Sequence, residues 1–83
     1  MILEENWAVD PLRAGEFFAA QPGSVPTGDG FILDRCTVTL AGTEELLFGK
    51  WPVRRCVLRF EGKEEDVRAV HRRFFLEFLS AGG

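Results

Sequence analysis

The chain has few of the side chains that most enzymes use for acid–base chemistry. Its 83 residues include one histidine, two cysteines and no tyrosine. General acids and bases are therefore restricted to carboxylates, lysines, the two thiols and His71. The sequence also contains no Gly-rich phosphate loop ending in Lys-Ser/Thr, no G-x-S-x-G, no H-E-x-x-H and no C-x-x-C. These absences favour a non-enzymatic protein, and we expect no cofactor.

Membrane and secretion signals are missing as well. No stretch reaches the roughly 18 apolar residues of a membrane-spanning helix. The first residues have neither a basic segment nor a long apolar segment, so they do not form a signal peptide. Two cysteines are too few for a disulfide scaffold. We therefore expect a cytoplasmic protein with reduced thiols and no membrane partner.

The net charge of −3 is unevenly distributed along the chain. Residues 1–49 have two basic and eight acidic side chains, a balance of −6, whereas residues 50–83 have eight basic and five acidic ones, a balance of +3. A chain divided in this way can pair with itself, within one molecule or between two, or it can present a basic patch. The overall acidity argues against extensive coating of nucleic acid.

Capping and turn residues divide the chain into helices and strands. Asp10 and Pro11 predict a helix that continues to about Ala20 and ends before Gln21-Pro22-Gly23. Residues 1–9 form an N-terminal arm or a short strand. Residues 21–30 contain two prolines and three glycines, which predicts a loop, either a plain connector or a functional one. Alternating patterns predict strands at Phe31 to Leu40, Glu45 to Lys50 and Val53 to Glu61, with a turn at residues 41–43.

The last third of the chain, from Lys63 to Ser80, predicts a second helix. It opens with three acidic residues, which suit the positive end of a helix dipole, and stops near Gly82 and Gly83. One stripe at helical spacing is formed by Val67, Val70, His71, Phe74 and Phe78. We therefore expect one α+β domain over residues 1–83, in α-β-β-β-α order. Its three-stranded antiparallel meander is covered by the C-terminal helix on one face, with the first helix at an edge or end.

The C-terminal helix has more apolar surface than this stripe requires. Phe75 widens the stripe, while Leu76 and Leu79 fall outside it, on the flank that also carries Arg72. A helix that is apolar on more than one side needs a second partner. We therefore expect a small protein–protein interaction module that forms a homodimer through Phe75, Leu76 and Leu79, with Arg72 beside them and a sheet edge as a further contact.

An alternative interaction surface is the sheet face opposite the cysteines. Alternation places Arg35, Arg55 and Arg59 on that face, where they either form a solvated surface or bind an acidic protein, a polyanion or nucleic acid. Nucleic acid is the less favoured partner because the chain is acidic overall. Trp51 stands at a turn, where it either packs back over the end of the sheet or forms an exposed binding anchor.

The cysteines and the histidine form the third candidate constellation. Alternation places Asp34, Cys36 and Cys56 on the core face of the sheet, and His71 on the helix that should cover it. These side chains could hold zinc or form a Cys–His nucleophile. However, Cys36 and Cys56 are 20 positions apart and His71 follows 15 positions later, unlike a closely spaced ligand pair. We therefore expect two buried thiols, one packed histidine and no metal.

Overall fold

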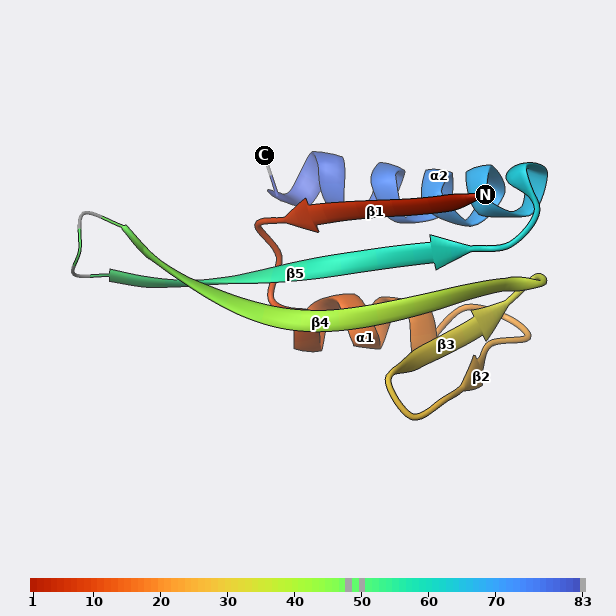
Figure 1. Ribbon diagram of the computed structural model, residues 1–83, viewed down its shortest axis with the longest axis horizontal. Helices are drawn as coiled ribbons and strands as arrows, with labels where there is room; N and C mark the ends of the chain where they lie inside the picture. Colours follow the sequence, from red (N-terminus) through yellow and green to blue (C-terminus); the bar gives the residue numbers. More distant parts are fainter. Residues whose placement is uncertain (48, 50, 83) are drawn as a thin grey trace.

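The computed structural model describes residues 1–47, 49 and 51–82, and contains two helices and one antiparallel sheet over that range. The elements are β1 (Ile2–Trp7), α1 (Pro11–Ala19), β2 (Val25–Pro26), β3 (Gly30–Leu33), β4 (Cys36–Leu47), β5 (Trp51–Glu61) and α2 (Glu64–Gly82). The strands lie side by side in the order β1-β5-β4-β3-β2 (Figure 1). The α+β class is confirmed. The three-stranded meander was wrong, because the sheet has five strands and the first element is a strand.

Both helices form where their end signals predicted. The side chain of Asp10 accepts a hydrogen bond of 2.9 Å from the backbone N–H of Leu12, and Pro11 occupies the first turn of α1. Glu64 begins α2, and two further acidic residues follow in its first turn. The expected buried stripe of α2 is confirmed at Val67, Val70, Phe74 and Phe78, whereas His71 is only partly buried.

The expected strand from Phe31 to Leu40 is interrupted by a tight turn. Asp34 and Arg35 have φ angles of 49° and 63°, and Leu33 pairs directly with Cys36 across this two-residue hairpin. The turn reverses the alternation, so Phe31 and Leu33 share a sheet face with Cys36. Asp34 and Arg35 lie in the turn and belong to neither face. The predicted faces were wrong here because no glycine marks the turn.

Strands form in residues 1–9, which the sequence left open between an arm and a short strand, and in part of the expected loop of residues 21–30. β1 pairs with β5 from Ile2 opposite Glu61 to Trp7 opposite Cys56, and β2 pairs with β3 inside the expected loop of residues 21–30. β4 continues through the expected turn at residues 41–43. There Gly42 allows α1 to approach, since an added Cβ would lie 3.1 Å from the Cγ of Pro11. Of the strand expected at 45–50, residues 48 and 50 lie outside the described residues.

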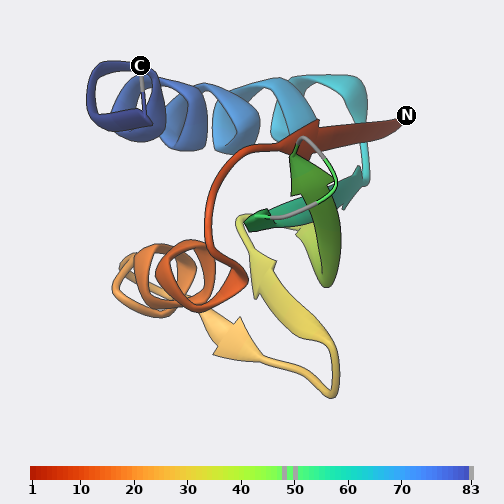
Figure 2. The ribbon, with the colours of Figure 1, turned by 90° about the vertical axis from the view of Figure 1, so that its left-hand side faces the viewer.

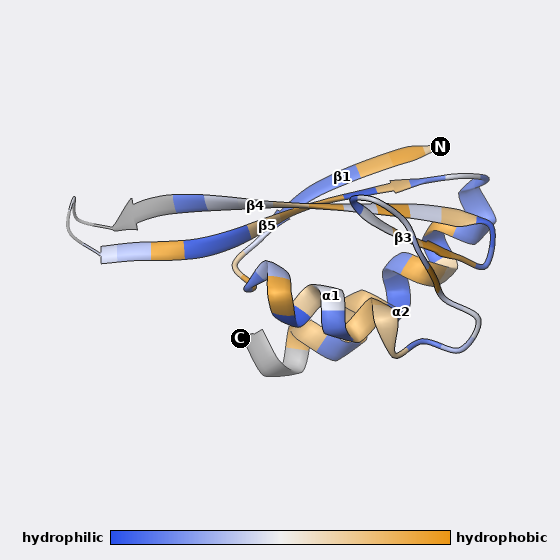
Figure 3. Ribbon diagram, turned by 90° about the horizontal axis from the view of Figure 1, so that it is seen from below, coloured by the Kyte–Doolittle hydropathy of each residue, from blue (hydrophilic) through white to orange (hydrophobic). Residues whose placement is uncertain are grey.

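Both helices pack on the same face of the sheet (Figure 3). Seen end-on, α2 lies beside β1 and α1 lies towards β2 and β3 (Figure 2). The placement of the first helix at an edge or end was therefore wrong, because its fully buried Phe18 stacks on Phe74 of α2 at 5.5 Å. Phe60 of β5 completes this aromatic centre. Burial of each ring contributes roughly 2–3 kcal/mol.

The hairpin of β4 and β5 extends beyond the rest of the sheet. Pairing with β1 ends at Cys56 and pairing with β3 ends at Thr39, but β4 and β5 stay paired as far as Leu47 and Trp51. Residues 43–47 and 51–55 form a two-stranded segment, called here the ribbon, which projects past both helices (Figures 1 and 3). Five residues per strand give it a length of about 17 Å.

Candidate interaction surfaces

Three large apolar side chains lie exposed on the outer side of α2. Phe75, Leu76 and Leu79, called here the outer stripe, are 38%, 58% and 52% exposed. Each residue advances a helix by about 100°, so these positions fall away from Phe74 and the core. The sequence predicted that Leu76 and Leu79 lie outside the buried stripe, and this is confirmed. Phe75 was expected to widen the buried stripe, but its side chain is exposed as well. Their role in binding stays a prediction.

A cation with no ion pair in the described part of the chain lies beside the outer stripe. Arg72 is exposed and stands four residues before Leu76, on the same side of α2. Its neighbours are engaged: Arg68 lies 2.6 Å from Glu64, and Arg73 lies 3.1 Å from Asp34 in the β3–β4 turn. Arg72 therefore presents its charge at the rim of an apolar surface.

A polar cluster attaches β1 to α2. Oε1 of Glu5 lies 2.7 Å from Nε2 of His71 and accepts a hydrogen bond of 3.0 Å from the indole N–H of Trp7. Burial by itself would raise the pKa of Glu5, but the hydrogen bonds from Trp7 and His71 and the charge of His71 lower it below the ordinary value. The Trp7 ring meets Phe74 and Phe75 edge to face, so this cluster also positions the outer stripe.

The outer edge of β1 is protected against pairing with another strand. Met1 and Gly62 exchange backbone hydrogen bonds of 2.7 and 3.1 Å, so alternation directs the backbone groups of Ile2, Glu4 and Asn6 outwards. Nε of Arg55 donates to the side chain of Asn6 at 2.8 Å, and Glu5 points inwards from this edge strand. Charges and short length discourage edge pairing. The edge of the sheet at β1 is therefore a weaker candidate for a protein-binding surface than α2.

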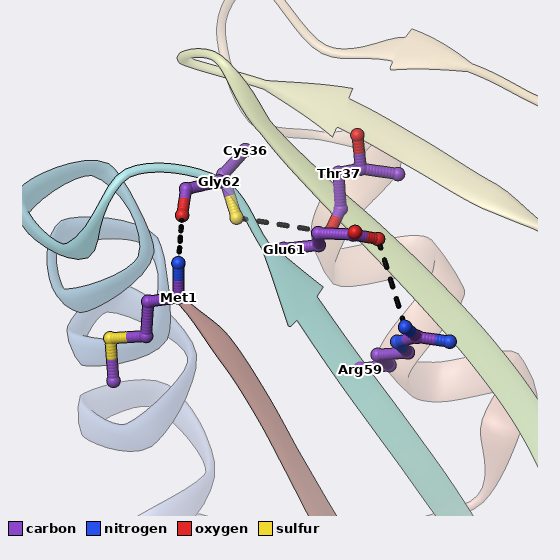
Figure 4. Close-up of polar contacts among 6 residues, drawn as sticks. All are labelled: Met1, Cys36, Thr37, Arg59, Glu61 and Gly62. Atoms are coloured by element: carbon purple, nitrogen blue, oxygen red, sulfur yellow. Dashed lines mark hydrogen bonds and ion pairs between the residues drawn. The ribbon is translucent and has the colours of Figure 1, made fainter.

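The sheet face opposite the helices carries two of the three expected arginines. Arg55 and Arg59 lie there, as alternation predicted, but Arg35 does not, because it lies in the β3–β4 turn. Glu61 lies 4.0 Å from Arg59 (Figure 4). Glu4 is the cross-strand partner of Arg59. The two arginines therefore share their face with two carboxylates, which removes a surplus of positive charge among the described residues.

The cysteines and His71 do not assemble into one site. Cys36 and Cys56 are fully buried, and Cys56 lies opposite Gly42, six positions along β4 from Cys36. At about 3.4 Å per residue this separates the two thiols by ~20 Å. Burial raises the pKa of both thiols, and each donates a weak hydrogen bond to the following residue's carbonyl, as Figure 4 shows for Cys36. Within residues 1–47, 49 and 51–82 no group of three His, Cys, Asp or Glu side chains is placed to hold a metal.

The ribbon presents Trp51, of which 62% is exposed. Of the two arrangements that the sequence allowed, the structure has the exposed one. Trp51 continues the side of β5 that carries Arg55 and Arg59, facing away from the helices. Sequence reasoning missed the ribbon itself. The sequence signal that could have indicated the ribbon is the run from Leu46 to Val53. This run is mostly apolar and contains one lysine, one glycine and no acidic residue.

No protein-family model, no curated protein and no solved structure matches this chain. Neither described helix is long and apolar enough to cross a membrane.

Proposed function

We propose that this chain is a small, non-enzymatic protein–protein interaction module that binds a second copy of itself through the outer stripe of α2. One observation carries the proposal: Phe75, Leu76 and Leu79 lie exposed together on a helix whose opposite side already fills the core. Burial of each such side chain contributes roughly 1.5–3 kcal/mol. A partner that covers the outer stripe gains this free energy without disturbing the fold.

The charges of the chain support a second copy as that partner. Exposed Arg72 borders the outer stripe, and exposed carboxylates such as Glu16 and Glu44 lie in the acidic first half of the chain. Two copies can bring these opposite charges together at the rim of an apolar contact. Such pairs set orientation and discourage wrong partners more than they add affinity.

The rigidity of α2 also supports binding. The Phe18–Phe74 stack fixes α2 to α1, and the Glu5–His71 contact fixes it to β1. A surface that is ordered before binding loses less conformational entropy in the complex. The outer stripe is therefore presented in one arrangement.

The experiment is solution mass by light scattering over a range of protein and salt concentrations. We expect a dimer that persists in high salt, since apolar burial is not screened. Leu76→Asp should weaken dimerisation by a factor of about 100 or more, because an unpaired carboxylate would have to be buried. Leu12→Asp, which alters a 68% exposed leucine on α1, is the matched control and should remain dimeric. A wild type that is monomeric at about 1 mM would contradict the proposal.

A second candidate function is polyanion or nucleic-acid binding through Arg55 and Arg59. The observation that favours it is the absence of a covering helix on their sheet face among the described elements (Figure 3). It predicts affinity for a short single-stranded oligonucleotide that falls steeply with salt. The carboxylates of Glu4 and Glu61 on the same face make this function the weaker of the two.

A further inference from the structure

We propose that the outer stripe of one copy binds the ribbon of the other, around Trp51, so that two copies exchange these contacts about a two-fold axis. This inference rests on the proposed function and names the surface that the outer stripe meets. Each copy then contributes one ribbon and one outer stripe, and the closed dimer contains two identical contacts.

The placement of the two surfaces supports exchange between copies. The ribbon and the C-terminal part of α2 extend towards the same end of the molecule (Figures 1 and 3). Trp51 nevertheless lies on the side of β5 that faces away from the helices. The ring therefore cannot cover the outer stripe of its own chain. A second copy, turned by half a rotation, can bring Trp51 to the outer stripe in both directions at once.

The available apolar area favours exchange over contact between two outer stripes. Phe75, Leu76 and Leu79 together expose on the order of 300 Å². A stable interface takes roughly 800 Å² from each partner. Trp51 adds about 150 Å² per copy. Outer stripes packed on each other would leave this surface unused.

The ribbon arginines are engaged within their own chain, since Arg54 lies 3.9 Å from Asp10 and Arg55 donates to Asn6. Exposed Glu44 is the cross-strand partner of Arg54 and lies on the side of the ribbon opposite Trp51. The contact around Trp51 therefore rests on apolar burial and not on the charges of the ribbon.

The test uses two variants that damage opposite halves of the contact. Trp51→Ala should weaken dimerisation by about 30-fold or more, as loss of an interface anchor does, and Leu76→Asp by about 100-fold or more. An equimolar mixture should form a heterodimer, detected by native mass spectrometry. In it the intact Trp51 of one chain meets the intact outer stripe of the other. Trp51→Phe retains an aromatic ring and should dimerise like the wild type, and circular dichroism checks that all variants fold.

Each alternative result separates this inference from the proposed function. If Trp51→Ala dimerises normally while Leu76→Asp does not, the outer stripes meet each other; the inference is wrong and the proposed function stands. If both variants are monomeric and their mixture is too, the exchange is also wrong. If Trp51→Ala is monomeric while Leu76→Asp dimerises normally, the ribbons of the two copies bind each other. This result would contradict both proposals, because the outer stripe would not be part of the contact. A monomeric wild type contradicts the proposed function itself.

Discussion

Nε2 of His71 lies 2.7 Å from Oε1 of Glu5, although the two residues are 66 positions apart in the sequence. This contact joins the edge strand β1 to α2, and the indole N–H of Trp7 donates to the same carboxylate oxygen. The only histidine of the chain therefore serves as a tie between two elements. Glu5 also places a charged side chain on the inward-facing side of the edge strand β1, and such a charge opposes the pairing of β1 with a strand of another molecule.

The Glu5 carboxylate should make stability dependent on pH in the acidic range. Because the pKa of Glu5 is lowered in the folded protein, its contribution is present above the ordinary glutamate value and is lost as pH falls through the lowered pKa. Denaturant unfolding between about pH 6 and 3 should show this loss. Glu5→Gln should reduce stability by about 1 kcal/mol at neutral pH and flatten the acidic decline. Glu4→Gln, on the opposite sheet face, is the control and should retain the loss of stability at acidic pH. If both variants flattened this loss equally, the effect would not come from Glu5.

Arg35→Gly should stabilise the protein. Arg35 has a φ of 63°, a left-handed conformation in which a side chain clashes with its own backbone, whereas glycine adopts it freely. We expect a gain of about 0.5–1 kcal/mol in the free energy of unfolding, measured with urea. Arg35→Ala is the control, because it removes the guanidinium but keeps the Cβ. A gain in the alanine variant equal to that of glycine would show that charge, and not backbone strain, is responsible.

Gly30→Ala should severely destabilise the fold. A Cβ at this position of β3 would lie 1.8 Å from the carbonyl oxygen of Val38 on β4, so the two strands would have to separate. The expected loss is about 3 kcal/mol or more. Gly28→Ala is the matched control, since a Cβ there meets no atom within 4 Å. Thermal unfolding of the two variants compares them directly, and similar melting temperatures would refute the close approach of β3 and β4.

Two neighbouring phenylalanines should have opposite roles. Phe74 is fully buried, so Phe74→Ala should cost about 3–5 kcal/mol of stability. Phe75 belongs to the outer stripe, so Phe75→Ala should leave the protein folded and weaken dimerisation by about 10-fold or more. Urea unfolding measures the first effect and light scattering the second. A Phe75→Ala variant that dimerises as tightly as the wild type would remove this ring from the contact.

Local signals determined how much of the fold could be predicted. The helix limits follow from Asp10, Pro11 and the acidic start of α2, all of which act on adjacent backbone groups. β1 was left open between arm and strand because its covered side includes the carboxylate of Glu5, whose partner lies far along the chain. The β3–β4 turn was missed because Asp34-Arg35 contains no glycine, the usual residue of such turns.

The same reasons explain what could be predicted of the candidate surfaces. Helical periodicity alone separates Leu76 and Leu79 from the buried stripe, whereas Phe75 lies next to that stripe and was expected to widen it. Strand alternation placed Arg55 and Arg59 correctly, but it failed for Arg35, since a two-residue turn reverses which face each later position occupies. Exposure of Trp51 depends on where the neighbouring strands end, and no local pattern in β4 or β5 encodes the lengths of β1 and β3.

The pairing of β1 with β5 has a consequence for the biogenesis of this protein. β1 is synthesised before β5, its sole strand partner among the described elements, which emerges about fifty residues later. Contacts between distant parts of a chain slow folding, because a large loop must close before they form. The nascent chain must therefore keep β1 unpaired on the ribosome until β5 has emerged, and the sheet is completed in a late step.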